Sequence, residues 1–417
     1  MQEYKDAIHY LEAVAKGNPL EFAKGASPIC KQICFGVLRD YYRLVYFRDS
    51  LLKKKLPAKH LDLNLLLLCG IYSICHLNRP AHASVNAVVE VTVMLKKPWA
   101  KGLVNAVMRN FQRQQKTLQG ESENEPEAQL NHPTWLIDQL RDSWPDLANM
   151  IMLANNEPAP MTLRVNQAKT SVSEYQSLLE EHGYGGQPIS GVPFALQLSK
   201  PAPVESLPGF TEGLVSVQDE ASQLVAPLLN TEPGHRVLDA CAAPGGKACH
   251  LLELQREIEL TAIDKDPRRV VQIKENLDRL GFDCTLITSD FFQYSGDKFD
   301  RILLDVPCSA TGIIRRHPDI KLLRDGDDIE NLTATQSKLL SAAWALLEAN
   351  GELVYSTCSV LLAENERIVS NFANGRDDIA VLPIDVNQGN KLEYGRQLFP
   401  QSNGHDGFYI ARLKKVG

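Results

Sequence analysis

The chain has 417 residues, 44% of them hydrophobic and 23% charged, which is the composition of a globular protein with room for two or three domains. Its most apolar window, 61–77, includes Asp62 and Asn64 and is short for a bilayer span. The first residues also lack a signal-peptide pattern, so we expect a cytoplasmic protein with no membrane partner. Nine cysteines at irregular spacings, with no C-x-x-C pair, argue against a disulfide framework and a structural metal site.

The charge is distributed unevenly along the chain. The total is −7, yet residues 1–120 hold 18 Lys and Arg against 8 Asp and Glu, so this part nets +10 and the remainder nets −17. A strongly basic first module on an acidic protein predicts a polyanionic partner for that module.

Residues 1–120 are predicted to be helical almost throughout. Apolar residues recur every three or four positions, as in Leu103, Val107 and Phe111. Basic residues form a stripe on another side of the same helix: Lys101, Arg109, Arg113 and Lys116. A solvated face and a phosphate-binding face both remain open, and the charge of the module favours phosphate.

The next stretch, 121–131, is polar, acidic and poor in apolar residues, which indicates a linker. Residues 132–230 then combine two helical patterns, a strand at 161–166, a helix at 171–182 and a strand near 194–198. This mixture predicts a small α+β subdomain. Arg164 in its first strand is expected to contact either a nucleic-acid phosphate or a surface carboxylate.

From 231 to 417, short apolar runs alternate with helix-length spacers such as 268–280 and 335–349. The expected strands are 237–238, 260–263, 285–288, 302–304 and 352–355. The alternation predicts a Rossmann-like, doubly wound parallel sheet, which binds ligands at the carboxyl ends of its strands. Acidic residues fall at or just past four predicted strand ends: Asp239, Asp264, Asp290 and Asp305.

The stretch 239–247 reads D-A-C-A-A-P-G-G-K and follows the first of these strands. Small residues and two glycines let the backbone approach a ligand closely, and the helix that follows directs its N-terminus at the ligand. Asp264, at the end of the second strand, is the usual partner of ribose hydroxyls. An ordinary strand–turn–helix corner is the alternative interpretation.

Two cysteine motifs follow the fourth and fifth strands. Residues 304–312 read L-D-V-P-C-S-A-T-G, and residues 355–359 read Y-S-T-C-S. A lone loop cysteine is usually unreactive, but Cys308 and Cys358 are both expected at the ligand-binding edge, where a thiolate is a strong nucleophile. The spacing does not decide which thiol attacks.

These motifs together resemble the S-adenosylmethionine-dependent RNA (cytosine-5) methyltransferases, in particular the RsmB/NOP family that acts on bacterial 16S ribosomal RNA, and the basic N-terminal part is similar to the NusB family. The resemblance covers essentially the whole chain. It implies a multidomain protein with an all-α NusB-like N-terminal domain at 1–120, the linker, the α+β subdomain, and a C-terminal α/β Rossmann-like class I methyltransferase domain at 231–417. Val306 departs from the family, which usually has Ala in D-A-P-C.

The resemblance also implies roles for individual residues. Cys358 would attack cytosine C6, Cys308 would help release the product, and Asp305 would bind the N3/N4 edge of the base. S-adenosylmethionine would contact the loop and three strand-end acids: Cys241, Ala242, Ala243, Pro244, Gly245, Gly246, Lys247, Asp264, Asp290 and Asp305. RNA phosphates would contact the stripe residues Lys101, Arg109 and Arg113 and the residues after the P-C motif: Arg315, Arg316, His317 and Lys321.

The implied partner is 16S ribosomal RNA, naked or in a partly assembled small subunit, and nothing in the sequence demands more than a monomer. Two alternatives remain open. One is a non-catalytic RNA-binding ribosome-assembly factor, which would have no physical need for paired thiols. The other is a DNA cytosine methyltransferase, which would be expected to use Cys308 as its nucleophile.

Overall fold

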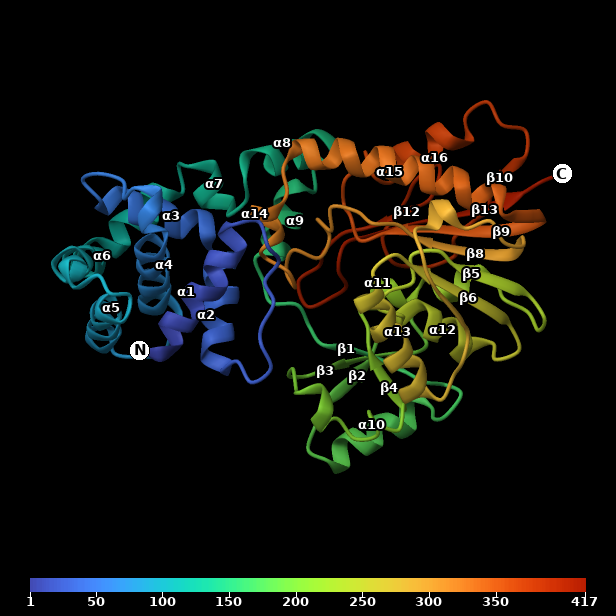
Figure 1. Cartoon of the computed structure of the whole chain (residues 1–417), viewed down its shortest axis with the longest axis horizontal. Helices are drawn as coiled ribbons and strands as arrows, with labels where there is room; N and C mark the ends of the chain where they lie inside the picture. Colours follow the sequence, from blue (N-terminus) through green and yellow to red (C-terminus); the bar gives the residue numbers. More distant parts are fainter. The chain divides into compact units, whose positions relative to one another are not determined.

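The computed structural model describes all 417 residues, and they divide into two compact units. The first comprises 1–157 and 314–326, and the second comprises 158–313 and 327–417. The chain therefore leaves the second unit just after the P-C motif and returns to it after a short excursion (Figure 1).

The first unit consists of helices. Their bounds are α1 (Gln2–Ala15), α2 (Pro28–Arg39), α3 (Tyr41–Leu51), η1 (Ala58–His60), α4 (Leu61–His76), α5 (Ala81–Met94), η2 (Pro98–Ala100), α6 (Lys101–Ser122), α7 (Pro126–Leu130), α8 (Thr134–Ser143), α9 (Ala148–Asn155) and α14 (Ile320–Leu323). The predicted helical first module is confirmed. The start of α2 shows its local cause, because Ser27 accepts a hydrogen bond from the backbone of Cys30 and Pro28 occupies the first turn.

Helix α4 forms the centre of this unit. The stretch 58–76 is long and apolar enough, by length and composition alone, to cross a membrane. However, Leu66 and Leu67 are fully buried in the unit's own core, together with Val104 and Phe111 of α6. A helix that is apolar on most sides is what the core of a helical unit requires.

The predicted acidic linker at 121–131 is wrong. Helix α6 continues to Ser122, α7 follows, and Asn131 is 1% exposed. The Asn131 amide donates to Asp40 Oδ1 at 3.0 Å and its oxygen accepts from the Arg43 backbone at 3.0 Å. The polar side chain of Asn131 is thus satisfied inside the unit, which composition alone does not reveal. Helices α8 and α9, expected in the subdomain, also belong to the first unit.

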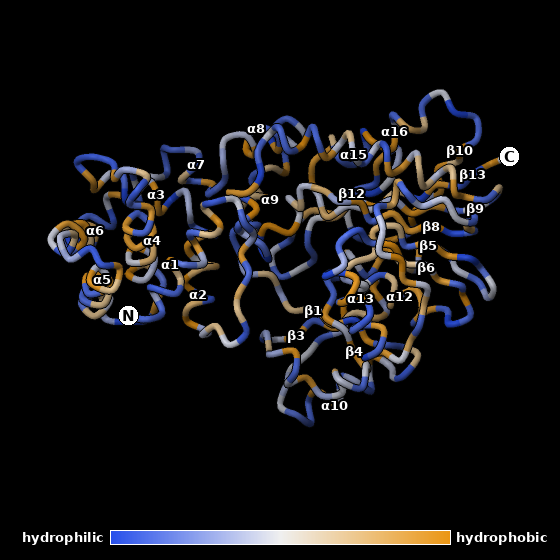
Figure 2. The backbone as a smooth tube through the Cα atoms, in the orientation of Figure 1, coloured by the Kyte–Doolittle hydropathy of each residue, from blue (hydrophilic) through white to orange (hydrophobic).

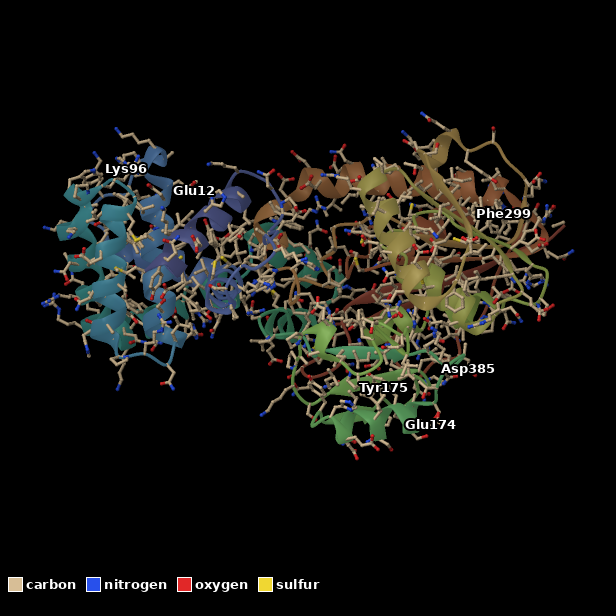
Figure 3. The ribbon with its side chains drawn as sticks, turned by 60° about the horizontal axis from the view of Figure 1, so that its bottom comes forward. Glu12, Lys96, Glu174, Tyr175, Phe299 and Asp385 are labelled. Atoms are coloured by element: carbon tan, nitrogen blue, oxygen red, sulfur yellow. The ribbon has the colours of Figure 1, made fainter.

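The second unit begins with a small four-stranded antiparallel sheet in the order β2-β3-β1-β4. The elements of this part are β1 (Thr162–Val165), α10 (Val172–Glu181), β2 (Gly186–Pro188), β3 (Ala195–Leu198), η3 (Val204–Ser206), β4 (Val215–Val217), α11 (Glu220–Gln223) and η4 (Ala226–Leu229). Helix α10 packs on the sheet through the buried Tyr175, while the neighbouring Glu174 completes a capping box with Ser171 (Figure 3). The predicted α+β character is confirmed.

The rest of the second unit is built on a nine-stranded mixed sheet, with β10 pairing β13 beside the path β11-β12-β13-β9-β8-β5-β6-β7. Its elements are β5 (Arg236–Asp239), α12 (Gly246–Leu254), β6 (Glu259–Asp264), α13 (Pro267–Leu280), β7 (Thr285–Thr288), η5 (Phe291–Gln293), β8 (Phe299–Asp305), α15 (Gly326–Ala345), β9 (Leu347–Thr357), α16 (Glu366–Ala373), β10 (Ile379–Val381), β11 (Asn390–Lys391), β12 (Arg396–Leu398) and β13 (Phe408–Lys415). Strands β9, β8, β5, β6 and β7 are parallel neighbours, which confirms the Rossmann-like prediction.

Helices cover both faces of this sheet. Val237 and Leu238 are successive residues of β5 that point to opposite faces, and they join two different cores. Helices α12 and α13 pack on the Val237 side, and α15 and α16 pack on the Leu238 side. Burial on both faces explains why the central strands are continuously apolar, as Figure 2 shows for β5, β6 and β8.

The antiparallel strands β10 to β13 were not among the predicted elements. Strand β13 pairs with β9 along most of its length, with Ile410 opposite Ser356. Helix α15 also ends at Ala345, earlier than the predicted 349, because β9 begins at Leu347.

Candidate functional site

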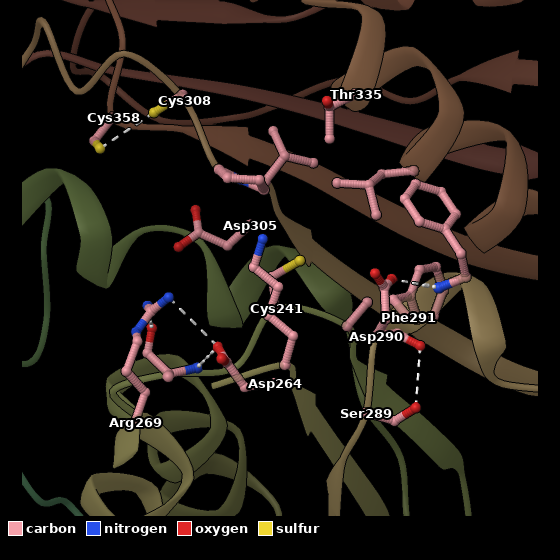
Figure 4. Close-up of a pocket in the computed structure, with 17 residues that line it drawn as sticks. Cys241, Asp264, Arg269, Ser289, Asp290, Phe291, Asp305, Cys308, Thr335 and Cys358 are labelled. Carbon is pink, nitrogen blue, oxygen red and sulfur yellow. Dashed lines mark hydrogen bonds and ion pairs between the residues drawn. The ribbon is translucent and has the colours of Figure 1, made fainter. Parts of the chain in front are cut away.

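The carboxyl ends of β5, β6 and β8 bring Asp239, Asp264 and Asp305 to one edge of the large sheet. A cleft of about 270 Å³ opens there (Figure 4). Its lining comprises Ala240, Cys241, Ala243, Asp264, Lys265, Arg269, Ser289, Asp290, Phe291, Phe292, Asp305, Val306, Pro307, Cys308, Thr335, Leu339 and Cys358. The predicted glycine-loop, strand-end and cysteine residues therefore meet in one place.

A tight turn at Gly245 shapes the loop between β5 and α12. Its φ of +96° lies in the left-handed region, and a Cβ there would lie 3.1 Å from Cα of Ile273. Helix α12 begins at Gly246, whose carbonyl accepts a hydrogen bond from Arg164 Nη1 at 2.8 Å. Arg164 is 1% exposed and also pairs with Glu253 at 2.7 Å. This arginine anchors the loop from inside, so it does not contact phosphate.

Asp264 is tied to the same loop. Its carboxylate accepts from the backbone of Ala243 at 3.2 Å and of Asp266 at 3.0 Å. Arg269, on α13, donates to the Ala243 carbonyl at 2.7 Å and lies 3.7 Å from Asp264 Oδ2 (Figure 4). The sequence analysis did not identify Arg269, although its position in the first turn of the helix that follows Asp264 could have indicated it.

Asp290 lies further along the cleft. It caps the short helix η5, since its Oδ1 accepts from the Phe292 backbone at 3.0 Å. Phe291 and Phe292 line the cleft beside it, and Phe292 is 49% exposed. An apolar wall beside an acidic group suits a flat, partly polar ring system.

Lys247 and Asp305 form an ion pair in the cleft region. The Lys247 Nζ lies 2.5 Å from Asp305 Oδ2, and Ser356 Oγ donates to Oδ1 at 2.6 Å. Burial acts to lower the pKa of Lys247, but the adjacent Asp305 outweighs it, and the pKa is raised above its ordinary value. Lys247 is therefore a permanent cation that fixes the Asp305 carboxylate.

Asp239 is a second residue to which the sequence analysis assigned no role in the site. It is 1% exposed, and neither carboxyl oxygen meets a hydrogen-bond donor of good geometry. Burial, reinforced by the nearby Asp305, raises the pKa of Asp239 to about 7. A smaller cavity beside the glycine loop is lined by this carboxyl together with Gln218, Ser222 and Lys247. An unsatisfied buried acceptor in a cavity is suited to a cationic ligand group.

The two predicted thiols lie side by side. Cys308 Sγ and Cys358 Sγ are 3.4 Å apart, and both are free cysteines (Figure 4). The hydrogen bond with Cys358, followed by burial and the negative field of Cys358 and Glu364, raises the pKa of Cys308 well above its ordinary value. At neutral pH Cys308 therefore keeps its proton, and it can exchange a proton only with a group or solvent molecule held close to it.

The residues predicted to contact RNA fall into two groups. Arg109 and Arg113 are exposed on α6 and line a cleft of about 330 Å³ with His82, Asn86, Val85 and Gln112. Their side chains bond only to neutral amides, Asn105 and Asn110. Lys101, by contrast, is paired with Glu90 at 2.9 Å.

The segment after the P-C motif requires a correction. Lys321 is 1% exposed and donates to the Arg39 carbonyl, the Asn131 carbonyl and Asn156 Oδ1 at 2.9, 2.8 and 2.7 Å. Burial lowers the pKa of Lys321 to about 7. Arg315 is buried as well. These two side chains are structural members of the first unit, whereas Arg316 is half-buried and His317 is exposed.

Comparison with known proteins agrees with this architecture. The family profiles that match are NusB over residues 3–113, the ferredoxin-like domain of RsmF/B methyltransferases over 132–205, and 16S rRNA methyltransferase RsmB/F over 226–414. The ribosomal RNA small subunit methyltransferase B of Pseudomonas syringae is 45% identical over 398 residues, covering 93% of this chain and 89% of the relative. The chain belongs to the 16S rRNA methyltransferase RsmB/F family.

Two solved structures share the fold. The protein PH0851 matches with a TM-score of 0.82 at 23% identity and covers 99% of both chains. A methyltransferase homologue from Pyrococcus horikoshii matches with a TM-score of 0.60 at 29% identity, covering 70% of this chain and 97% of the homologue. The NusB-like, α+β and methyltransferase parts predicted from the sequence are thus confirmed.

Proposed function

We propose that this protein transfers a methyl group from S-adenosylmethionine to C5 of a cytosine in 16S ribosomal RNA, through a transient bond between Cys358 and C6 of the base. The observation that supports this most strongly is the 3.4 Å separation of the Cys308 and Cys358 sulfur atoms at the glycine-loop edge of the sheet. Two thiols at one ligand-binding edge suit chemistry that needs a nucleophile and a separate proton carrier.

The cleft fits the cofactor. The close approach of the loop at Gly245, the Asp264 carboxylate at the end of β6 and the apolar wall at Phe292 match a loop-bound methionine end, a ribose and an adenine, respectively. The unsatisfied Asp239 carboxyl would hold the cofactor's ammonium group. When bound, S-adenosylmethionine supplies an electrophilic methyl group.

The chain's own residues would then make cytosine reactive. C5 is a weak nucleophile until the Cys358 thiolate adds to C6 and converts the ring into an enamine. C5 of the enamine would then take the methyl group as its bond to the sulfonium sulfur breaks, which leaves S-adenosylhomocysteine. Asp305, held by Lys247 and Ser356, would bind the N3/N4 edge and stabilise the ring during addition. Loss of the C5 proton and of the C6–S bond restores aromaticity and returns the Cys358 thiolate.

Cys308 would assist this release. Its raised pKa keeps the sulfur protonated at neutral pH, so Cys308 would first give its proton to solvent and then take the C5 proton. Cys308 is then a thiol again, and Cys358 is a thiolate once the C6–S bond breaks. The assignment of attack to Cys358 and release to Cys308 follows from the family resemblance of the T-C and P-C motifs.

RNA would bind partly through the helical unit. Arg109 and Arg113 have no carboxylate partner and line one cleft, which is suited to a phosphodiester backbone. Flipping a stacked cytosine costs a few kcal/mol, which such phosphate contacts would offset. We propose a cytoplasmic monomer whose substrate is 16S ribosomal RNA, naked or in a partly assembled small subunit.

The test is methyl incorporation from labelled S-adenosylmethionine into 16S RNA from cells that lack the protein, with 5-methylcytosine mapped along the RNA. We expect label at one or a few cytosines and at C5. Binding of the RNA without any methyl transfer would favour a ribosome-assembly factor instead, and methylation of DNA in place of RNA would favour a DNA methyltransferase.

A further inference from the structure

Glu364 occupies the buried centre of the loops that carry the two cysteines. It lies between β9 and α16 and is 0% exposed. Its Oε1 accepts from the Ser309 backbone at 2.7 Å and from Gln336 Nε2 at 3.0 Å, and its Oε2 accepts from the hydroxyls of Ser309 and Ser359, each at 2.5 Å. All four hydrogens come from uncharged groups.

The two serines are the residues that directly follow the cysteines. Ser309 follows Cys308 and Ser359 follows Cys358, so one carboxylate joins the P-C loop to the T-C loop immediately beside both sulfur atoms. Further hydrogen bonds join the same loops. The Gly312 backbone donates to the Cys358 carbonyl at 2.9 Å, the Val360 backbone donates to Thr311 Oγ1 at 3.2 Å, and Ser359 Oγ lies 3.1 Å from Thr311 Oγ1 and 3.3 Å from Ser309 Oγ. The loops come from different strands, so their separation depends on these cross-connections.

The hydrogen-bond donors around Glu364 match the two oxygens of its side chain. Four donors converge on these oxygens, which is the number that a carboxylate can accept. Buried carboxylates of this kind are costly unless every lone pair is used, so the site is a built one rather than an accident of packing.

We infer that Glu364 is a positioning residue that holds the sulfur atoms of Cys308 and Cys358 next to each other. A role of Glu364 in catalysis rests on the proposed cytosine chemistry, whereas its effect on the two thiols does not. Nothing in the D-V-P-C or T-C motifs indicates this residue, because it lies six positions past Cys358 and outside both.

The charge of Glu364 has a second consequence. It contributes to the negative field that keeps the Cys308 thiol protonated, after the larger effects of the hydrogen bond with Cys358 and of burial. The other titratable groups near this pair are Tyr355 on β9, Asp305 at the end of β8 and, beside Cys358, Lys247 on α12. Removal of the Glu364 charge therefore lowers the pKa of Cys308, an effect that a merely space-filling residue would not have.

The experiment compares Glu364→Gln with the control Glu352→Gln in the full-length protein without RNA or cofactor. Glu352 is also a poorly exposed carboxylate, paired with Arg412 at 2.7 Å, but it lies in the middle of β9, away from both cysteine loops. Two quantities are measured by mass spectrometry: the pH dependence of Cys308 alkylation by iodoacetamide, and the rate at which diamide oxidises Cys308 and Cys358 to a disulfide while it is reduced to its hydrazine.

In Glu364→Gln we expect the alkylation midpoint of Cys308 to fall by about half a pH unit or more. Disulfide formation should slow by about fivefold or more, because the sulfur atoms are no longer held in contact. Glu352→Gln should change neither quantity. Equal behaviour of the two variants would overturn the inference.

A kinetic measurement separates this inference from the proposed function. On 16S RNA, Glu364→Gln should lower kcat by about 10- to 100-fold with KM for RNA changed by less than about twofold. Loss of methylation with unchanged thiol chemistry would overturn the positioning role. Altered thiol chemistry in a protein that never forms 5-methylcytosine would support the positioning role and reject the proposed function.

If Glu364→Gln does not fold, Ser309→Ala and Ser359→Ala provide the same test, because each removes a hydroxyl bond to Glu364 and leaves the carboxylate in place. Each should slow Cys308–Cys358 disulfide formation by about twofold or more, while Ser337→Ala, on the exposed side of α15, should not. Wild-type rates in both alanine variants would overturn the inference.

Discussion

The cysteine-bearing edge of the large sheet differs from the face of the helical unit that carries Arg109 and Arg113 in what fixes the charged side chains. At the sheet edge, Lys247 is fixed by Asp305, and Asp305 in turn by Ser356. On the helical face, Arg109 and Arg113 bond only to neutral amides on their own helix.

This difference reflects two kinds of recognition. Fixed dipoles and charges lower the cost of reorganisation in a chemical step, so a reactive site benefits from partners that are already in place. A surface that tracks a flexible phosphate backbone needs cations that are free to exchange partners. Lys321 shows that a basic residue close in sequence to the P-C motif need not be available to RNA, since its side chain is buried and fully bonded.

The largest expected effect concerns the nucleophile at the sheet edge. Cys358→Ser should reduce methyl transfer by about a thousandfold or more, because a hydroxyl is far less nucleophilic than a thiolate at neutral pH. The measurement is single-turnover methylation of 16S RNA. Cys284→Ser, which changes a half-buried thiol just before β7, should retain wild-type activity. Appreciable methylation by Cys358→Ser would remove this residue from the chemistry.

The second-largest expected effect concerns Lys321, the buried lysine of the first unit. Lys321→Met should lower the free energy of unfolding by about 2–4 kcal/mol, because three buried oxygens lose their donor. The salt dependence of RNA binding should stay unchanged. Urea unfolding and RNA titration at several salt concentrations test both statements, with the exposed Lys116→Gln as the control for stability. A reduced salt slope would show that Lys321 contacts phosphate after all.

A pH effect is expected at Asp239. Its folded-state pKa of about 7 exceeds the unfolded value, so the carboxyl stabilises the fold at low pH and this contribution is lost as pH rises through about 7. An asparagine at this position does not titrate. The free energy of unfolding of Asp239→Asn, relative to that of wild type, should therefore rise by about 2–4 kcal/mol between pH 4 and 8. Urea unfolding at both pH values measures this. Asp297→Asn should show no such trend, and a pH-independent difference for Asp239→Asn would contradict the assignment.

The smallest expected effect lies on the helical face. Arg109→Gln with Arg113→Gln should weaken RNA binding by about tenfold at low salt and reduce the salt slope by about two, because two phosphate contacts are lost. Lys101→Gln should have less effect, since Lys101 is already paired with Glu90. Titrations at increasing salt provide the measurement. Identical slopes for the double variant and wild type would identify α6 as ordinary solvated surface.

Sequence patterns were sufficient for the elements whose signals are local. The apolar runs at β5, β6 and β8, and the acids that end them, follow from strand burial and from the edge at which parallel strands deliver their side chains. The short antiparallel strands β10 to β13 lack such a signal, because they are held by pairing with β9 rather than by their own composition.

The remaining differences arise from contacts between distant residues. Lys321 and Asn131 look like surface residues in the sequence, yet they bond to each other inside the helical unit across 190 positions. Glu364 and Asp239 are comparable cases at the sheet edge: the first depends on two loops meeting, and the second on the lack of a well-aligned hydrogen-bond donor. Spacing along the chain carries no information about either condition.

The central claim, a transient sulfur–carbon bond between Cys358 and the RNA, is tested most directly by trapping it. Cys308→Ser protein is mixed with 16S RNA and S-adenosylmethionine and resolved on a denaturing gel. We expect a slowly migrating protein–RNA complex, because addition proceeds and release is blocked, and we expect the complex to disappear in the variant that also carries Cys358→Ser. A complex formed by Cys358→Ser alone, or by neither single variant, would contradict it.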